Sequence, residues 1–254
     1  MNPARWIAHF TSNTGINREM ALPNSPVTLS DSHRGSIARS LAIFQLGESG
    51  GGTRLRHYVR ETKLDELPGY SDAIAAFVAE EQSHAALLAR LLERLEQAPL
   101  EKQWTNSVFR WMRNLVNLEF NIQVLLTAEL IAEVYFGALA RRCPDCNVQT
   151  VARKLLRDEI GHLAFQREFL VTRLRGFSGG MRGLWKLQFH FIHGCTARVV
   201  AWDHRHCLRA LGLRPAEFCA RSTWSRRRFL QRLERMIVTQ RPLPRVIAAV
   251  QTSR

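Results

Sequence analysis

Two five-residue segments decide which fold this sequence encodes. Residues 80–84 read Glu-Glu-Gln-Ser-His, and residues 158–162 read Asp-Glu-Ile-Gly-His. Each segment places a glutamate three residues before a histidine, so that both side chains lie on the same face of an α-helix. That face is otherwise apolar, because Leu88 continues the first and Leu155 precedes the second. Acids and imidazoles therefore occupy positions at which an amphipathic helix buries hydrophobic residues.

The surrounding sequence has the periodicity of helices. Apolar residues recur at three- and four-residue steps through four long segments, and strand-like alternation is absent over any useful length. The segments predicted as helices are 36–60, 71–97, 105–142 and 147–175. Short links within the first and last pairs predict antiparallel neighbours, and hence an all-α four-helix bundle.

Three regions are expected along the chain. Residues 1–35 are rich in Pro, Asn and Ser and lack periodicity, so they predict an irregular N-terminal arm. Residues 36–177 form the predicted bundle. After a glycine-rich break, residues 178–254 contain two more helical segments, 184–211 and 216–239, which we expect to pack on the bundle as a basic C-terminal extension.

Carboxylates interrupt the apolar faces of all four bundle helices. Burying an unpaired charge costs several kcal/mol, whereas a whole domain is stable by only about 5–15 kcal/mol. A cationic group must therefore lie among these acids, and four carboxylates neutralise two divalent metal ions. One Glu from each of two helices, with Glu-x-x-His from each of the other two, is the donor arrangement of di-iron and di-manganese bundles. The predicted metal ligands are Glu48, Glu81, His84, Glu129, Glu159 and His162.

The ligand from the third helix has a competitor. Glu133 lies one turn beyond Glu129. We favour Glu129, because it lies closer to the apolar stripe of Ile122 and Leu125, and we keep Glu133 as the alternative ligand.

In these motifs the sequence resembles the ferritin-like di-iron carboxylate superfamily, from residue 36 to about residue 175. The resemblance implies that Glu81 and Glu159 bridge two metal ions. It also implies that Glu48 and His84 complete one metal site, whereas Glu129 and His162 complete the other. The implied cofactors are two iron ions, with Mn/Fe or Mn/Mn as alternatives, together with O2 as co-substrate and an external electron donor.

The acids that precede the two motif glutamates have an implied role as well. In members with such an acid, it holds the histidine of the opposite motif. The resemblance therefore assigns Asp158 to His84 and Glu80 to His162, which would fix the orientation of both rings.

The function implied by this resemblance is an O2-dependent di-iron or Mn/Fe oxidoreductase. We expect an oxygenase that acts on a small organic substrate, free or tethered to a carrier protein. The alternatives are a tRNA or RNA hydroxylase, and a metal protein that is not an oxygenase, for iron storage or peroxide scavenging. The segments before and after the bundle would obstruct the packing of a ferritin cage, which disfavours iron storage.

The net charge of +14 is concentrated near the C-terminus, where residues 178–254 hold 15 basic and 3 acidic residues. Such asymmetry predicts an anionic partner: an acidic protein or carrier first, RNA second and an anionic membrane third. The candidate anion-binding residues are Arg226, Arg227 and Arg228. A solvated basic face is the alternative interpretation.

The composition argues for a soluble intracellular protein. The longest uncharged stretch is about eleven residues, Leu187 to Ala197, whereas a membrane-spanning helix needs roughly twenty. No secretory signal is evident, and five cysteines do not indicate a disulfide scaffold. We therefore expect a cytoplasmic location, and a homodimer is compatible with the sequence.

Overall fold

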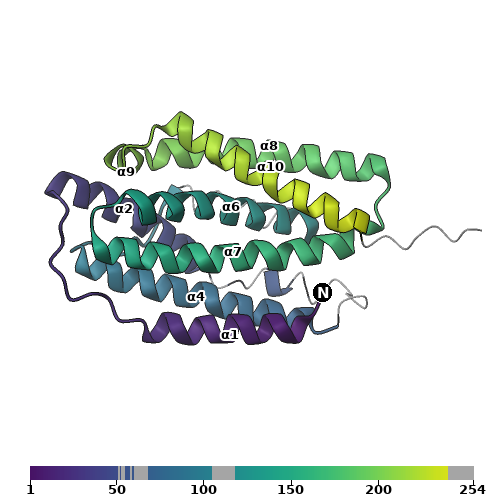
Figure 1. The fold of residues 1–254 in the computed structure, drawn as a ribbon, viewed down its shortest axis with the longest axis horizontal. Coiled ribbons are helices and arrows are strands. Elements are labelled where there is room, and N and C mark those ends of the chain that lie inside the picture. Colours follow the sequence, from purple (N-terminus) through teal and green to yellow (C-terminus); the bar gives the residue numbers. More distant parts are fainter. Residues whose placement is uncertain (51, 53–54, 58, 60–67, 105–117, 240–254) are drawn as a thin grey trace, which may run out of the picture.

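The computed structural model describes residues 1–50, 52, 55–57, 59, 68–104 and 118–239, and these residues form helices without strands (Figure 1). The helices are α1 (Pro3–Glu19), α2 (Asp31–Glu48), α4 (Tyr70–Arg94), α6 (Leu118–Arg142), α7 (Cys146–Arg175), α8 (Gly179–Asp203), α9 (Arg205–Ala210) and α10 (Pro215–Thr239). The predicted all-α bundle is confirmed. Residues 105–117 of the predicted third helix and residues 240–254 lie outside the described part of the chain.

Helices α2, α4, α6 and α7 correspond to the four predicted bundle helices. Helix α2 packs on α4, α6 packs on α7, and α4 also contacts α7. The turn between α6 and α7 is short because the Asp145 side chain accepts a hydrogen bond from the Val148 amide at 3.0 Å and caps α7. Asp145 also accepts from the Thr28 amide at 3.1 Å, which anchors the segment between α1 and α2.

The hydrophobic core divides into two clusters at the level of the predicted site. Along α4, residues up to Val78 belong to one cluster, and residues from Leu87 onward belong to the other. Along α7, the division falls between Leu155 and Leu163. The two Glu-x-x-His segments lie in these gaps, so that a polar layer separates two apolar ends of the bundle.

The expectation of an irregular N-terminal arm is wrong for residues 3–19, which form α1 against α4 (Figure 1). Pro3 opens the helix, and the Asn2 side chain caps it by accepting a hydrogen bond from the Arg5 amide at 3.2 Å. The buried face consists of Trp6, Phe10, Thr14 and Asn17. Half of these side chains are polar, so a search for apolar periodicity does not detect this helix.

The C-terminal helices form an outer layer over α6 and α7 (Figure 1). Helix α8 begins at Gly179, so most of the predicted glycine break is helical. The predicted segment 184–211 is two helices, because the chain turns at His204 between α8 and α9.

One helix among the described residues, Phe120–Arg142, is long and apolar enough to span a membrane by length and composition. However, 83% of its most apolar window is buried inside the protein. Packing within the bundle therefore accounts for its hydrophobicity.

We predict that Phe10→Ala lowers the free energy of unfolding by about 3–5 kcal/mol, because a fully buried aromatic side chain leaves a cavity. Urea denaturation followed by circular dichroism measures this loss. The control is Ile16→Ala, which changes a half-exposed residue of the same helix and should shift stability by no more than about 0.5 kcal/mol. Equal effects of the two substitutions would show that α1 is not part of the cooperative fold.

Candidate metal centre

The four predicted carboxylate ligands line one cavity, and each comes from a different bundle helix. Glu48 is the last residue of α2, and Glu81, Glu129 and Glu159 lie on α4, α6 and α7. Helix α2 ends at Glu48, so the predicted segment 36–60 is interrupted there, although the described residues 55–57 and 59 are helical again. Beyond Glu48 the chain turns through Gly52, whose φ of +58° suits glycine. A Cβ atom there would lie 2.3 Å from Val78 Cγ2, so glycine is also required by packing.

Glu81 is shared between two sets of ligand atoms. Glu48, Glu81 and His84 offer atoms within 4.8 Å of one another, and so do Glu81, Glu159 and His162. The Nδ1 atom of His162 lies 3.1 Å from Glu81 Oε1 and 3.5 Å from Glu159 Oε2. The Nδ1 atom of His84 lies 3.7 Å from the same Glu81 oxygen. Two groups joined by one glutamate can hold two neighbouring cations.

Glu129 belongs to the same electrostatic cluster. Burial raises the pKa of Glu129 well above its usual value; the His162 imidazole opposes this rise, and the Glu159 carboxylate adds to it. The Gln166 side-chain amide donates a hydrogen bond to Glu129 Oε1. Glu129 therefore faces the other acids, as predicted, although it is not among the tightest groups of ligand atoms.

Burial also raises the pKa of Glu81 and of Glu159, and in Glu81 the neighbouring Glu48 carboxylate is the next cause. Burial alone would lower the pKa of His162, but the Glu81 carboxylate and contacts with Glu159 and Glu80 raise it well above its usual value. The cluster thus reduces its charge by binding protons, since the described residues that line the cavity include no lysine or arginine.

Unpaired polar atoms at the cavity show that a metal ion fits these residues. Within the described part of the chain, several buried side-chain atoms at this cavity have no hydrogen-bond partner. They comprise Glu48 Oε2, Glu81 Oε1, Glu129 Oε2, Glu159 Oε2, His84 Nδ1 and His162 Nδ1. Four carboxylate oxygens and two imidazole nitrogens make a donor set that suits iron or manganese.

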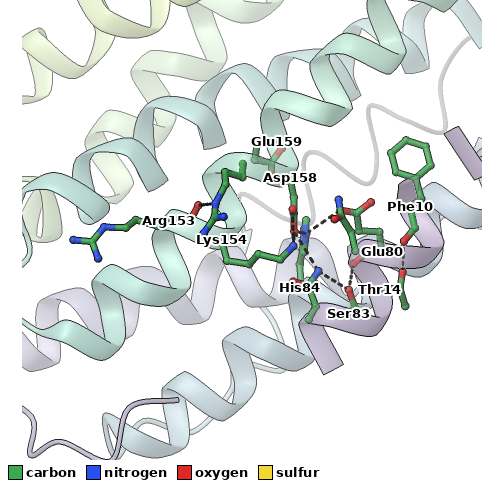
Figure 2. A network of polar contacts seen from close by, with 12 residues as sticks. Phe10, Thr14, Glu80, Ser83, His84, Arg153, Lys154, Asp158 and Glu159 are labelled. Atoms are coloured by element: carbon green, nitrogen blue, oxygen red, sulfur yellow. Dashed lines mark hydrogen bonds and ion pairs between the residues drawn. The ribbon is translucent and has the colours of Figure 1, made fainter. Parts of the chain in front are cut away.

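The outer nitrogen of His84 is held as expected (Figure 2). Its Nε2 atom donates to Asp158 Oδ2 at 3.0 Å, and Lys154 Nζ lies 2.6 Å from Asp158 Oδ1. Burial would raise the pKa of Asp158, but the hydrogen bonds from His84 and Lys154 lower it. The charged Asp158 keeps the proton of His84 on Nε2, so Nδ1 presents its lone pair to the carboxylates.

The outer nitrogen of His162 faces Glu80, also as expected. Its Nε2 atom lies 3.6 Å from Glu80 Oε2, and the Glu80 side chain is completely buried. The other Glu80 oxygen lies 3.8 Å from His84 Nε2, so Glu80 faces both rings. Asp158 therefore holds His84 by a hydrogen bond, whereas Glu80 faces His162 without a hydrogen bond to its Nε2 atom.

Two asparagines of α1 complete this support, and the sequence analysis did not identify them. Asn13 Nδ2 donates to Glu80 Oε1 at 2.9 Å, and Asn17 Nδ2 donates to Asp158 Oδ2 at 3.2 Å. Their four-residue spacing was the available signal, because it places both on one helical face. Gly161 allows α1 to approach: a Cβ atom at this position would lie 2.7 Å from His9 Nε2.

The alternative ligand Glu133 points away from the cavity. Its carboxylate pairs with Arg228 and accepts a hydrogen bond from Ser225, both on α10. Its two oxygens are thus engaged by α10, one helical turn along α6 from Glu129. This placement favours Glu129 as the ligand from α6.

The three predicted anion-binding arginines do not share a surface. Arg226 is 9% exposed and donates to the His190 carbonyl oxygen at 3.3 Å, whereas Arg228 is paired with Glu133. Only Arg227 is exposed. The expectation of a joint anion site is therefore wrong in this form, because consecutive residues on a helix point in different directions.

The cavity beside the acids is mainly apolar and has a volume of about 150 Å³. This is the size of a cavity that accommodates benzene. Its polar lining beyond the four glutamates includes His204 at the end of α8, whose pKa burial lowers to about 4. His204 is therefore neutral at physiological pH. The apolar lining includes Ile43, Phe44, Val124, Leu125, Ile131 and Val200.

No family model, curated protein or solved structure matches this chain. The structure itself shows a helical bundle with a buried cluster of glutamates and histidines that can hold a metal ion.

We predict that Glu129→Gln stabilises the metal-free protein relative to wild type, and increasingly so as pH rises above about 4.5. A carboxyl whose pKa is raised by folding favours the folded state at low pH and opposes it as pH rises towards the folded-state pKa. The difference in free energy of unfolding should grow by up to about 1.4 kcal/mol per pH unit. Urea denaturation of chelator-treated protein from pH 5 to pH 8 measures it.

The comparison between variant and wild type cancels the contributions of other groups, such as His193 and His204, whose pKa values are lowered. A difference that is constant or shrinks over this range would contradict the raised pKa of Glu129.

Proposed function

We propose that the protein is a di-metal oxidoreductase, with two iron ions or a manganese–iron pair, that uses O2 to oxidise a small apolar substrate. The observation that carries this proposal is the set of six buried, unpaired donor atoms beside an apolar cavity. The resemblance to ferritin-like di-iron proteins supports the same assignment. It also supports Glu81 and Glu159 as the ligands that join the two metal ions.

A bound pair of redox-active metals would supply the electron transfer to O2 that no amino-acid side chain provides. Insertion of one oxygen atom into a C–H bond consumes O2, two electrons from an external donor and two protons, and yields an alcohol and water. The part of the protein is to hold the ligands, exclude water and position the substrate.

Several residues have defined tasks in this scheme. Asp158 orients His84 through a hydrogen bond and Glu80 faces the outer nitrogen of His162, so that both Nδ1 atoms are directed at the carboxylates. The raised pKa values of Glu81, Glu129 and Glu159 mean that metal ions replace protons when the site fills. Phe44 and Leu125 cover the cavity with apolar surface, which keeps water from the acids.

The cavity favours a neutral substrate. Among the described residues that line it, apolar side chains outnumber polar ones and there is no arginine or lysine to pair with an anionic group. Thr196 and the neutral His204 are the polar residues of the lining that remain to orient a substrate. An apolar molecule with at most one neutral polar group matches this lining better than a nucleotide does.

We predict about two transition-metal ions per chain after expression with iron and manganese, measured by elemental analysis of protein purified without chelator. Glu81→Gln should remove most of this metal, because Glu81 contributes to both ligand groups. Glu133→Gln is the matched control and should retain the metal, since Glu133 pairs with Arg228 instead. Metal-free wild-type protein, or equal metal content in both variants, would overturn the proposed centre.

The oxygenase assignment needs its own measurement. Metal-loaded protein, reduced with dithionite and freed of excess reductant, should consume O2 faster when a small apolar compound such as toluene is present. Two bound metals without any O2 consumption would leave a metal-binding protein that is not an oxygenase.

A further inference from the structure

Helix α8 exposes large apolar side chains on its outer face, four between Met181 and Phe191 and one at Trp202. We call these residues the α8 stripe; its members are Met181, Leu184, Leu187, Phe191 and Trp202. They are between 53% and 71% exposed. At 100° per residue, they fall within an arc of about 120°, so they form one face along most of the helix. Exposed apolar patches of this extent mark sites of protein or membrane contact.

The stripe is not the packing face of α8. The opposite face is buried against the bundle through residues such as Phe189 and Ala197. The same inner side contributes Thr196 and Val200 to the lining of the cavity beside the metal centre. One face of α8 therefore lines the cavity, and the other presents its apolar residues to the outside. In Figure 1, α8 lies in the outer layer of the molecule.

The C-terminal helices, which include the stripe, are rich in basic residues. Residues 178–239 include 12 basic and 3 acidic residues. All three acids are engaged: Asp203 accepts from Gln103, Glu217 pairs with Arg221, and Glu234 pairs with Lys186.

Two arginines lie at the stripe itself. Arg198 is exposed on the same face of the helix. The guanidinium of Arg205 lies 4.8 Å from the Trp202 ring centroid, and Trp104 contacts the same indole. Aliphatic and aromatic side chains beside arginines form the pattern of a helix that lies in a membrane interface.

From these observations we propose that α8 docks the protein on an anionic lipid surface, with the α8 stripe inserted at the boundary between headgroups and acyl chains. The basic residues of the outer layer attract anionic headgroups, and the apolar row then enters the bilayer. This mode of binding uses both the basic residues and the exposed apolar side chains of the α8 stripe.

Other occupants match the surface less well. A second copy of the chain, related by twofold symmetry, would bring two positively charged layers together. RNA would meet the charge but not the aliphatic row, and the two aromatic residues of the stripe are about 16 Å apart along the helix. An acidic protein partner would account for the arginines but not for the five exposed hydrophobic residues.

Docking in this orientation would place the membrane near the cavity, and the importance of this closeness rests on the proposed function. The bilayer would lie about 10 Å from the cavity, which is the thickness of one helix. An apolar substrate dissolved in the membrane would then be close to the cavity.

Sedimentation with lipid vesicles tests the proposal. The full-length, metal-loaded protein should bind vesicles of equal parts phosphatidylglycerol and phosphatidylcholine at least about tenfold more strongly than pure phosphatidylcholine, at a salt concentration of about 50 mM. The triple variant Leu184→Gln, Leu187→Gln, Phe191→Gln should bind the anionic vesicles roughly tenfold or more weakly, since it loses the inserted side chains. Its metal content should equal that of wild type, because none of the three residues is a ligand.

The matched control replaces three exposed apolar residues elsewhere, Ile16→Gln, Ile160→Gln and Val238→Gln, which are 50%, 51% and 63% exposed. This variant should bind vesicles like wild type. Wild-type protein that ignores anionic vesicles, or equal binding by the two variants, would overturn the proposal. So would a dimer in sedimentation equilibrium that only the stripe variant abolishes, because the stripe would then contact a second copy. A failure of vesicle binding with intact metal content leaves the proposed metal centre unaffected.

Discussion

The structure depends on one electrostatic constraint: four carboxylates and two imidazoles occupy the interior of a helical bundle. Each unpaired buried charge costs several kcal/mol, which is comparable to the stability of an entire domain. Without metal, burial raises the pKa values of Glu81, Glu129 and Glu159, and the cluster therefore binds protons. With metal, the cations would neutralise the same acids. In either state, the bundle must hold these six side chains in place as a polar layer that interrupts its core.

The elements around this layer hold it in place from outside. Lys154 and Asp158 form a buried ion pair, which by itself contributes little to stability. The ion pair instead keeps Asp158 in position, and Asp158 fixes the orientation of the His84 ring. Helix α1 acts in the same way through Asn13 and Asn17, which hold Glu80 and Asp158. The N-terminal helix is therefore part of the site although it supplies no ligand.

The sequence predicts much of this arrangement, because the residues that matter interrupt a regular apolar pattern. Glu81 and Glu159 stand out on helical stripes, and the acids before them face the histidines as predicted. Helix α1 could not be found in this way, since Thr14 and Asn17 are polar members of its buried face. The choice between Glu129 and Glu133 depends on Arg228, a residue of α10 that is distant in sequence. Which arginines of α10 are buried likewise depends on tertiary packing.

Anomalous diffraction from crystals of the protein grown with iron or manganese would locate the bound metal ions. We predict two anomalous peaks inside the bundle, bounded by Glu81 and Glu159, with the Nδ1 atom of each histidine directed at a peak. Data collected at the absorption edges of iron and manganese would also identify each metal. Crystals that bind metal only at the surface, with protonated carboxyl groups hydrogen-bonded to one another in the cavity, would contradict this prediction.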